Sequence, residues 1–446
     1  MMDWLRRIPA AEMGLPAIVL LAAVFGGAGQ EGFGLHAGIA IVTILIAAQH
    51  FNASAQQPFD WLQAAAVLLF AALPTVMLLQ VVPLPPNLWT MLPGREIYAE
   101  GYRTAQLALP YLPVSLSPER TLQAATMTFV PLLAFAIALT TTRRALRISL
   151  ALLVVAAGVG VLMGFYQTSS GLYPYDITNR GNGVGLFANA NQAAVFYVTA
   201  LCAAAIFAIE LASAPRAPSP LLLLLGLAGV AAVMFAGVLS TNSRAGLGLF
   251  LMALPVLATA LLFSVRKRAR TLQFWLLLAS SLLLAILLSW AVATNMFDLT
   301  LATAREVDRP IIWARTLDLA WSFFPVGAGA DTFVDVYPRM ENPNAVTFLF
   351  VNAAHNDYLE WLFEFGILAP VFVAGAVVIL IRGALRRIAA APDLASAVIA
   401  ATTALLTVML HSVVEYPLGV LAMSVPMTLF AAYLLRLPEG QPRKRR

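Results

Sequence analysis

The sequence predicts an all-α integral membrane protein that crosses the bilayer about twelve times. The chain of 446 residues is 61% hydrophobic and only 11% charged, whereas roughly a quarter of a soluble protein is charged. Apolar runs of roughly 18 or more residues, the length that spans a bilayer as a helix, recur along the chain. Residues 1–446 are therefore predicted to form a single transmembrane domain.

The first apolar segment resembles a secretory signal, because Arg6 and Arg7 precede it and small residues follow it. Eleven further apolar segments come after it, so we expect an uncleaved first span. The twelve predicted helices lie at about 14–30, 35–51, 61–82, 121–142, 147–167, 190–211, 219–240, 244–264, 271–293, 354–381, 393–411 and 418–436.

Basic residues gather in the connections on one side of this map. They include 18 of the 27 Lys and Arg residues, at Arg6, Arg7, Arg143, Arg144, Arg147, Arg216, the RKRAR cluster 266–270, Arg382, Arg386, Arg387, Arg436 and the terminal RKRR. Positively charged connections stay in the cytoplasm. Both termini are therefore predicted to be cytoplasmic, with 437–446 as a basic tail.

The opposite side carries three longer loops, at 83–120, 168–189 and 294–353. None is large enough for an independent enzyme domain. The third, between predicted helices 9 and 10, contains AREVDRPIIWARTLDLAW, whose apolar spacing indicates short amphipathic helices. No G-x-x-x-x-G-K-[ST] motif is present, which argues against a built-in ATPase.

The residues that usually bind metals are few and far apart. The four histidines are at 36, 50, 355 and 411, and the one cysteine, Cys202, lies in an apolar run. This spacing predicts neither a zinc site nor a disulfide, and we expect no metal and no cofactor.

Ionisable residues at membrane depth are functional candidates, because lipid exposure would cost kilocalories. On the less basic side lie Arg244, Arg309, Arg315, His355, His411 and Glu415. The stretch VNAAHNDYLEWLFEFG (351–366) adds three acids; at 100° per residue Asp357, Glu360 and Glu364 share one helix face, with His355 roughly opposite. In one interpretation the acids interact favourably with the N-terminal dipole of the helix, and Asn356 or Asn352 caps it. In the other interpretation His355 is a base that abstracts a proton.

The arginines allow two interpretations as well. They could contact lipid headgroups, which we expect of Arg305. Arg244, in STNSRAGLG (240–248), and Arg309 instead suit an anion site, because guanidinium groups match phosphate oxygens bidentately. Two arginines and a histidine without a metal-ligand cluster indicate chemistry on a phosphorylated lipid.

Five segments together resemble the O-antigen ligase and polymerase superfamily of bacterial envelope glycosyltransferases, with the related protein O-oligosaccharyltransferases. They are GLFANANQA (185–193), TNSRAG (241–246), DRPIIWARTLDLAWSFFPVGAGADTF (308–333), AHNDYLEWLFEFG (354–366) and HSVVEYPL (411–418). Many relatives have a proline or histidine where this chain has Ala190 and Gln192.

The resemblance implies a GT-C-like inner-membrane enzyme that moves a glycan, on the periplasmic face, from undecaprenyl pyrophosphate to a hydroxyl acceptor. It assigns Arg244 and Arg309 to the pyrophosphate and His355 to the role of base, with inversion at the anomeric carbon. Asn189 and Asn191 are expected to line the donor site, and Tyr358 to orient the acceptor. Arg315, His411 and Glu415 are expected to support the site.

Several functions remain open at this level. The acceptor is lipid A–core for a ligase, a lipid-linked glycan for a polymerase, or a protein for an oligosaccharyltransferase. We favour ligase or polymerase, since the chain carries no long extra tail. A transporter or flippase for a lipid-linked sugar is the alternative from another class, although it should have repeated halves and charges accessible from both sides. Nucleic acid is not an expected partner, because the basic residues lie at helix ends.

Overall fold

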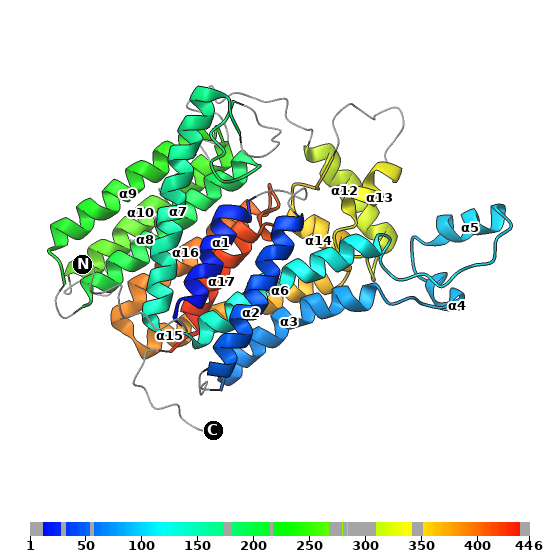
Figure 1. The fold of residues 1–446 in the computed structure, drawn as a ribbon, viewed down its shortest axis with the longest axis horizontal. Helices are drawn as coiled ribbons and strands as arrows, with labels where there is room; N and C mark the ends of the chain where they lie inside the picture. Colours follow the sequence, from blue (N-terminus) through cyan, green and yellow to red (C-terminus); the bar gives the residue numbers. More distant parts are fainter. Residues whose placement is uncertain are drawn as a thin grey trace.

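The computed structural model shows a bundle of long apolar helices (Figure 1). It describes residues 12–27, 33–53, 58–173, 181–214, 217–266, 309–340 and 351–437, together with Ala279 and Leu283. Within these ranges the chain is helical, without a named strand, and one isolated bridge joins Leu84 to Leu112. The prediction of an all-α membrane protein is thus confirmed at the level of class.

The long helices mostly follow the predicted apolar segments, and short helices lie between them. They are α1 (Gly14–Phe25), α2 (Phe33–Ala53), α3 (Trp61–Gln80), α4 (Pro86–Trp89), α5 (Glu96–Thr104), α6 (Pro118–Thr140), α7 (Arg143–Ser170), α8 (Ala190–Ala212), α9 (Pro220–Ser240), α10 (Arg244–Arg266), α12 (Arg309–Phe323), α13 (Phe333–Val336), α14 (Asp357–Phe365), α15 (Leu368–Ala390), α16 (Ala395–His411) and α17 (Leu421–Leu435).

Nine helices in the described ranges are long and apolar enough to cross a membrane, and α1 and α17 are shorter apolar helices. The predicted span 271–293 lies outside the described residues, apart from Ala279 and Leu283, so the count of twelve stays a prediction. The basic clusters at Arg6, Arg7, Arg216, 267–270 and the tail also lie outside them, as does Arg305.

The core of the bundle is α8, which packs against α7, α9, α10 and α16. Of its most apolar window, 78% is buried, more than in any other candidate span. Close packing needs small residues where helices meet. At Gly246, for example, a Cβ atom would lie 2.3 Å from the Cβ of Ala194, so glycine lets the start of α10 approach the start of α8.

One predicted helix is wrong. The segment 354–381 forms two helices, α14 and α15, which are separated at Gly366. Gly366 has φ 55°, and a Cβ there would lie 2.0 Å from the carbonyl oxygen of Pro325. The helix also begins at Asp357, so His355 precedes it and shares no helix face with the acids. Hydropathy alone could not reveal this break, because apolar residues continue on both sides of Gly366.

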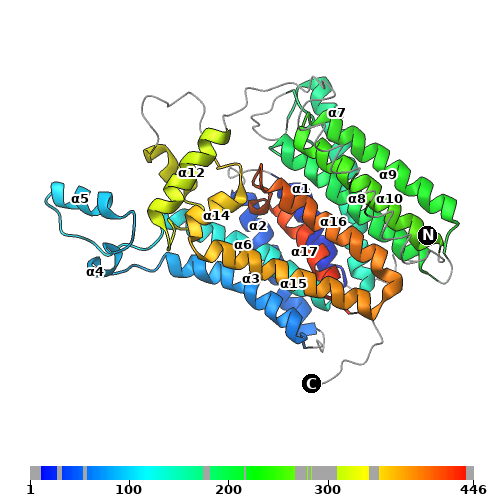
Figure 2. The ribbon, with the colours of Figure 1, turned by 180° about the vertical axis from the view of Figure 1, so that it is seen from behind.

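The two ends of the bundle differ in charge. At one end Arg147 pairs with Glu210 and Arg386 with Asp60, at 2.5 and 2.9 Å. We call this the basic end, since the predicted cytoplasmic residues that the structure describes gather there. At the other end α8 and α10 begin and α16 finishes, near α12 and α14 (Figure 2). A segment with α4 and α5 extends away from the ends of α3 and α6 (Figure 1).

Candidate active site

Glu415 is the centre of a polar cluster at the end of the bundle opposite the basic end. Its side chain is 1% exposed. Oε1 accepts hydrogen bonds from Arg309 Nη2 at 2.6 Å and Asn191 Nδ2 at 2.7 Å. Oε2 lies 3.2 Å from His355 Nδ1 and 3.4 Å from Asn189 Nδ2. The structure therefore brings four predicted site residues together around the carboxylate of a fifth, Glu415.

These residues come from helix ends that are far apart in the sequence. Asn189 caps α8 by accepting from the backbone N–H of Asn191, at 2.8 Å. Arg309 is the first residue of α12, and Glu415 lies in the connection between α16 and α17. His411, the last residue of α16, is fully buried and interacts electrostatically with Glu415 and Arg309.

His355 has a backbone conformation that is rare for a residue with a side chain. Its φ is 50°, in the left-handed region that costs most residues roughly 1 kcal/mol. The preceding residue is held at both of its backbone groups: Ala354 N–H donates to Glu360 Oε2 at 2.8 Å, and Trp313 Nε1 donates to Ala354 O at 3.0 Å. Contacts from α12 and α14 thus fix the histidine.

The segment after His355 is fixed as well. Asn356 caps α14 by accepting from the N–H groups of Tyr358 and Leu359, as one of the two capping alternatives predicted. The N–H of Asp357 donates to the carbonyl of Ser412 at 2.9 Å. These bonds tie the start of α14 to the turn that carries Glu415, so both partners of the His355–Glu415 contact share one frame.

The electrostatics of the cluster determine which group carries the proton. Burial raises the pKa of Glu415, but the hydrogen bond with His355, the charge of His355 when its ring is protonated, and the positive charge of Arg309 outweigh burial and lower the pKa overall. An ionised carboxylate can only accept hydrogen bonds. Nδ1 of His355 is therefore the donor, and in the neutral ring Nε2 is left as the proton acceptor.

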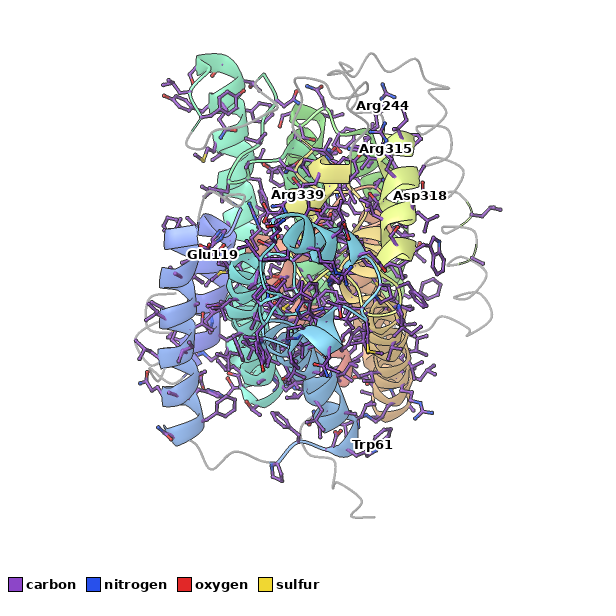
Figure 3. The ribbon with its side chains drawn as sticks, turned by 90° about the vertical axis from the view of Figure 1, so that its right-hand side faces the viewer. Trp61, Glu119, Arg244, Arg315, Asp318 and Arg339 are labelled. Carbon is purple, nitrogen blue, oxygen red and sulfur yellow. The ribbon has the colours of Figure 1, made fainter. Side chains whose placement is uncertain are left out.

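Arg244 is the first residue of α10. The residue before it, Ser243, contacts the cluster around Glu415. Ser243 Oγ donates to Asn191 Oδ1 at 2.7 Å, and Asn191 in turn binds Glu415. Asn242, with φ 54°, donates to Asn182 Oδ1 at 2.7 Å. The side chain of Arg244 lies toward the same end of the molecule as Arg315 of α12, opposite Trp61 (Figure 3).

Tyr416 was not singled out from the sequence, and Asn352 was considered only as a helix cap. The rings of Tyr416 and His355 meet edge to face, with centroids 5.3 Å apart. Asn352 Nδ2 donates to the Tyr416 hydroxyl at 3.1 Å, while burial followed by the charge of Glu415 raises the pKa of Tyr416 to about 12. Tyr416 directly follows Glu415 in HSVVEYPL (411–418), and this position could have indicated that it belongs to the site.

The short helix α14 is not among the helices long enough to cross a membrane. Its three acids differ in their position along the helix and in their contacts. Burial raises the pKa of Glu360 to about 7, although its bond from Ala354 N–H lowers it. Burial also raises the pKa values of Asp357 and Glu364. Asp357 and Glu360 lie in the first turn, where the helix dipole favours them, but Glu364 lies in the last turn. The dipole interpretation is therefore wrong for Glu364.

The remaining predicted residues have plain structural settings. The Tyr358 hydroxyl donates to the carbonyl of Met409 at 2.8 Å and so links α14 to α16. Arg315 is half-buried on α12. Among the residues that the structure describes, no three His, Cys, Asp or Glu side chains converge as metal ligands, and independence from metal stays a prediction.

Comparison with known proteins finds one family match, over part of the chain. Residues 229–374 match the family model described as O-antigen ligase. This segment runs from α9 to the first turns of α15 and includes Arg244, Arg309 and His355, whereas Asn191 and Glu415 lie outside it. No curated protein matches the chain significantly. The match of residues 229–374 supports the resemblance to the O-antigen ligase superfamily that the sequence motifs indicate.

Proposed function

We propose that the protein transfers a glycan from undecaprenyl pyrophosphate to a hydroxyl acceptor, with inversion and without a metal ion. The match of residues 229–374 to the O-antigen ligase family model supports glycan transfer in envelope polysaccharide assembly. The observation that carries the mechanism is the pair of contacts on Glu415, His355 Nδ1 on Oε2 and Arg309 Nη2 on Oε1. One carboxylate thus orients a base and a phosphate-binding group toward the same place.

His355 acts as the base in this proposal. Nε2 accepts the proton of the acceptor hydroxyl as its oxygen attacks the anomeric carbon. The bond from that carbon to the pyrophosphate oxygen breaks on the opposite face, and undecaprenyl pyrophosphate leaves with the electron pair. Glu415 does not touch the substrate: it keeps Nδ1 protonated and stabilises the positive imidazolium that forms.

Arg309 and Arg244 serve the leaving group. The Arg309 side chain is 32% exposed, and its contact with Glu415 is through Nη2. A guanidinium has five N–H donors in a planar fork, so one face can bind Glu415 while others bind phosphate oxygens. Arg244, at the first position of α10, supplies a second positive charge at the same end of the bundle. Both charges stabilise the negative charge that grows on the pyrophosphate.

The distribution of basic residues between the two ends of the bundle indicates which end faces the cytoplasm. The basic end is assigned to the cytoplasm by the positive-inside rule, so the cluster around Glu415 faces the periplasm of an inner-membrane protein. A transporter would need polar groups along a path between both sides, whereas the cluster gathers at one end. Lipid A–core is the acceptor of a ligase and a second lipid-linked glycan that of a polymerase; protein acceptance is the third alternative.

The test is a transfer assay with purified protein, an undecaprenyl-pyrophosphate glycan and each acceptor in turn. Asparagine adopts the left-handed conformation more readily than other residues with side chains, so His355→Asn removes the base without adding backbone strain. We expect its kcat to fall about 10²-fold or more, with a modestly lower melting temperature because the buried Glu415 loses one of its four donors. His50→Asn is the matched control, because His50 bonds Thr140 near the basic end and should leave kcat unchanged. Full transfer by His355→Asn would refute the mechanism, and absence of transfer to every acceptor by the wild type would refute the function.

A further inference from the structure

A small pocket opens at the basic end of the bundle, away from the Glu415 cluster. Its empty space, open solvent included, is about 330 Å³. The start of α7 and the ends of α8, α15 and α17 surround it, and these elements lie at one end of the bundle in both views (Figure 1; Figure 2). Its polar lining consists of Arg143, Arg147, Glu210, Arg387, Tyr433 and Arg436.

The pocket lining is strongly positive. Four arginines and one glutamate leave a net charge of +3. Glu210 offsets part of the charge, since it accepts from Arg147 Nε at 2.5 Å and from the Tyr433 hydroxyl at 3.1 Å. A concentration of charge of one sign in a partly enclosed space attracts a counter-ion.

Arg387 lines this pocket with an incompletely satisfied guanidinium. The residue is 4% exposed, and its Cζ lies 4.1 Å from the centre of the Tyr433 ring. Nη1 donates to the carbonyl of Arg436, but Nε has no hydrogen-bond partner among the described residues. A buried donor on a charged group is costly without a partner, and an anion in the pocket would supply one.

Arg143 points to the same conclusion. It is the first residue of α7, where the helix dipole is positive and disfavours a cation. Arginines at helix C-termini are favoured by the dipole and bond the last carbonyls, as Arg387 does on α17. Arg143 lies at a helix N-terminus, so the dipole does not favour its charge. A bound anion would offset the repulsion between Arg143 and this dipole.

We propose that this pocket binds the phosphate group of an anionic phospholipid headgroup. Basic pockets between transmembrane helices on the cytoplasmic side suit such headgroups, and the pocket lies at the helix ends that the positive-inside rule assigns to that side. Its interior admits one water-sized group, which fits a phosphate oxygen that enters while the rest of the lipid stays in the bilayer. The site is separate from the proposed glycan transfer and does not depend on it.

The test measures binding of phosphatidylglycerol, phosphatidylcholine and sodium phosphate to the full-length protein in a neutral detergent, from the shift in melting temperature and by native mass spectrometry. We expect phosphatidylglycerol to bind and the other two to have little effect. Arg143→Gln should weaken the binding about tenfold, the usual effect of a lost charged hydrogen bond. Arg382→Gln, an exposed arginine of α15 outside the pocket, removes the same charge and should change nothing.

Glu210→Gln is a second variant, and it should change phosphatidylglycerol binding in the opposite direction. The amide can still accept from Tyr433, but the lining becomes more positive, so phosphatidylglycerol should bind several-fold more tightly. If Arg143→Gln does not fold, this variant still tests the proposal. Equal losses in Arg143→Gln and Arg382→Gln, unchanged binding in Glu210→Gln, or equal binding of phosphatidylcholine would overturn the site, and equal protection by sodium phosphate would overturn its assignment to a lipid.

Discussion

Replacing Glu415 with glutamine should reverse the hydrogen bond that prepares His355. Arg309 and Asn191 both donate to Oε1, so the amide oxygen takes that position. The amide nitrogen then faces Nδ1 of His355, where Oε2 stood at 3.2 Å. An amide nitrogen is a donor, so Nδ1 becomes the acceptor and the proton moves to Nε2. The ring is then in the wrong tautomer to accept the proton of the substrate hydroxyl.

The size of the effect follows from the role of a general base. Such a base contributes about 10²- to 10⁴-fold to the rate, which corresponds to roughly 3–5 kcal/mol of transition-state stabilisation. Arg309 keeps an acceptor but loses a charged partner, and Glu415 is almost fully buried, so we expect a loss of about 1–3 kcal/mol in the free energy of unfolding. The Michaelis constant for the donor should change little, because the arginines remain.

The assay is initial-rate transfer at saturating donor, with melting temperatures measured on the same samples. Glu210→Gln makes the same substitution in an ion pair at the basic end, where the glutamate side chain is 10% exposed, and should keep a wild-type kcat. Glu415→Asp keeps the charge and should recover part of the rate. A kcat for Glu415→Gln within threefold of wild type would refute the tautomer argument, as would a loss of rate that matches only the loss of folded protein.

Three further changes test the surroundings of Glu415. Arg309→Lys keeps a charge but loses the planar fork; we expect a donor Michaelis constant raised about tenfold, and an unchanged constant would contradict phosphate binding. Trp313→Phe removes the donor to the carbonyl of Ala354, which should lower kcat several-fold with a stability loss of only about 1 kcal/mol; a loss of stability without a loss of kcat would make the contact merely structural. Because burial raises the pKa of Glu360 to about 7 from 4.5, the folded protein binds more protons than the unfolded chain between these values and loses stability as pH rises through them, by at most about 3 kcal/mol. Glu360→Gln should therefore flatten the fall in melting temperature between pH 5 and 8, and an equally steep fall would show that other groups cause it.

The fold could largely be predicted because membrane helices depend on a local property. Length and apolar composition located α2, α3, α6 and α8 within a few residues. The same property could not show where an apolar segment breaks. The break at Gly366 depends on the close approach of the Pro325 carbonyl, which comes from a distant part of the chain.

The site was predictable in its members but not in its arrangement. His355, Arg309, Asn189 and Asn191 stood out as polar groups at membrane depth or in family motifs. Glu415 was expected only to support the site, because its partners lie 60 to 226 residues away and no local pattern indicates such contacts. The helical-face argument for His355 failed because the residue precedes the helix, with φ 50°. An N-cap at Asn356 was the local signal for that boundary.

A fully buried carboxylate is tolerable only when its acceptor positions are filled. Glu415 meets this condition with four donors, two on each oxygen: Arg309 and Asn191 on Oε1, His355 and Asn189 on Oε2. The set contains no hydroxyl that could reverse its direction, and Arg309 and the asparagine amides can only donate through these nitrogens. Nδ1 of His355 is thus committed to donating by the same balance that makes the burial of Glu415 possible. The proposed chemistry at Nε2 is therefore a consequence of how the charge is buried, and the stability of this cluster and its reactivity have one physical cause.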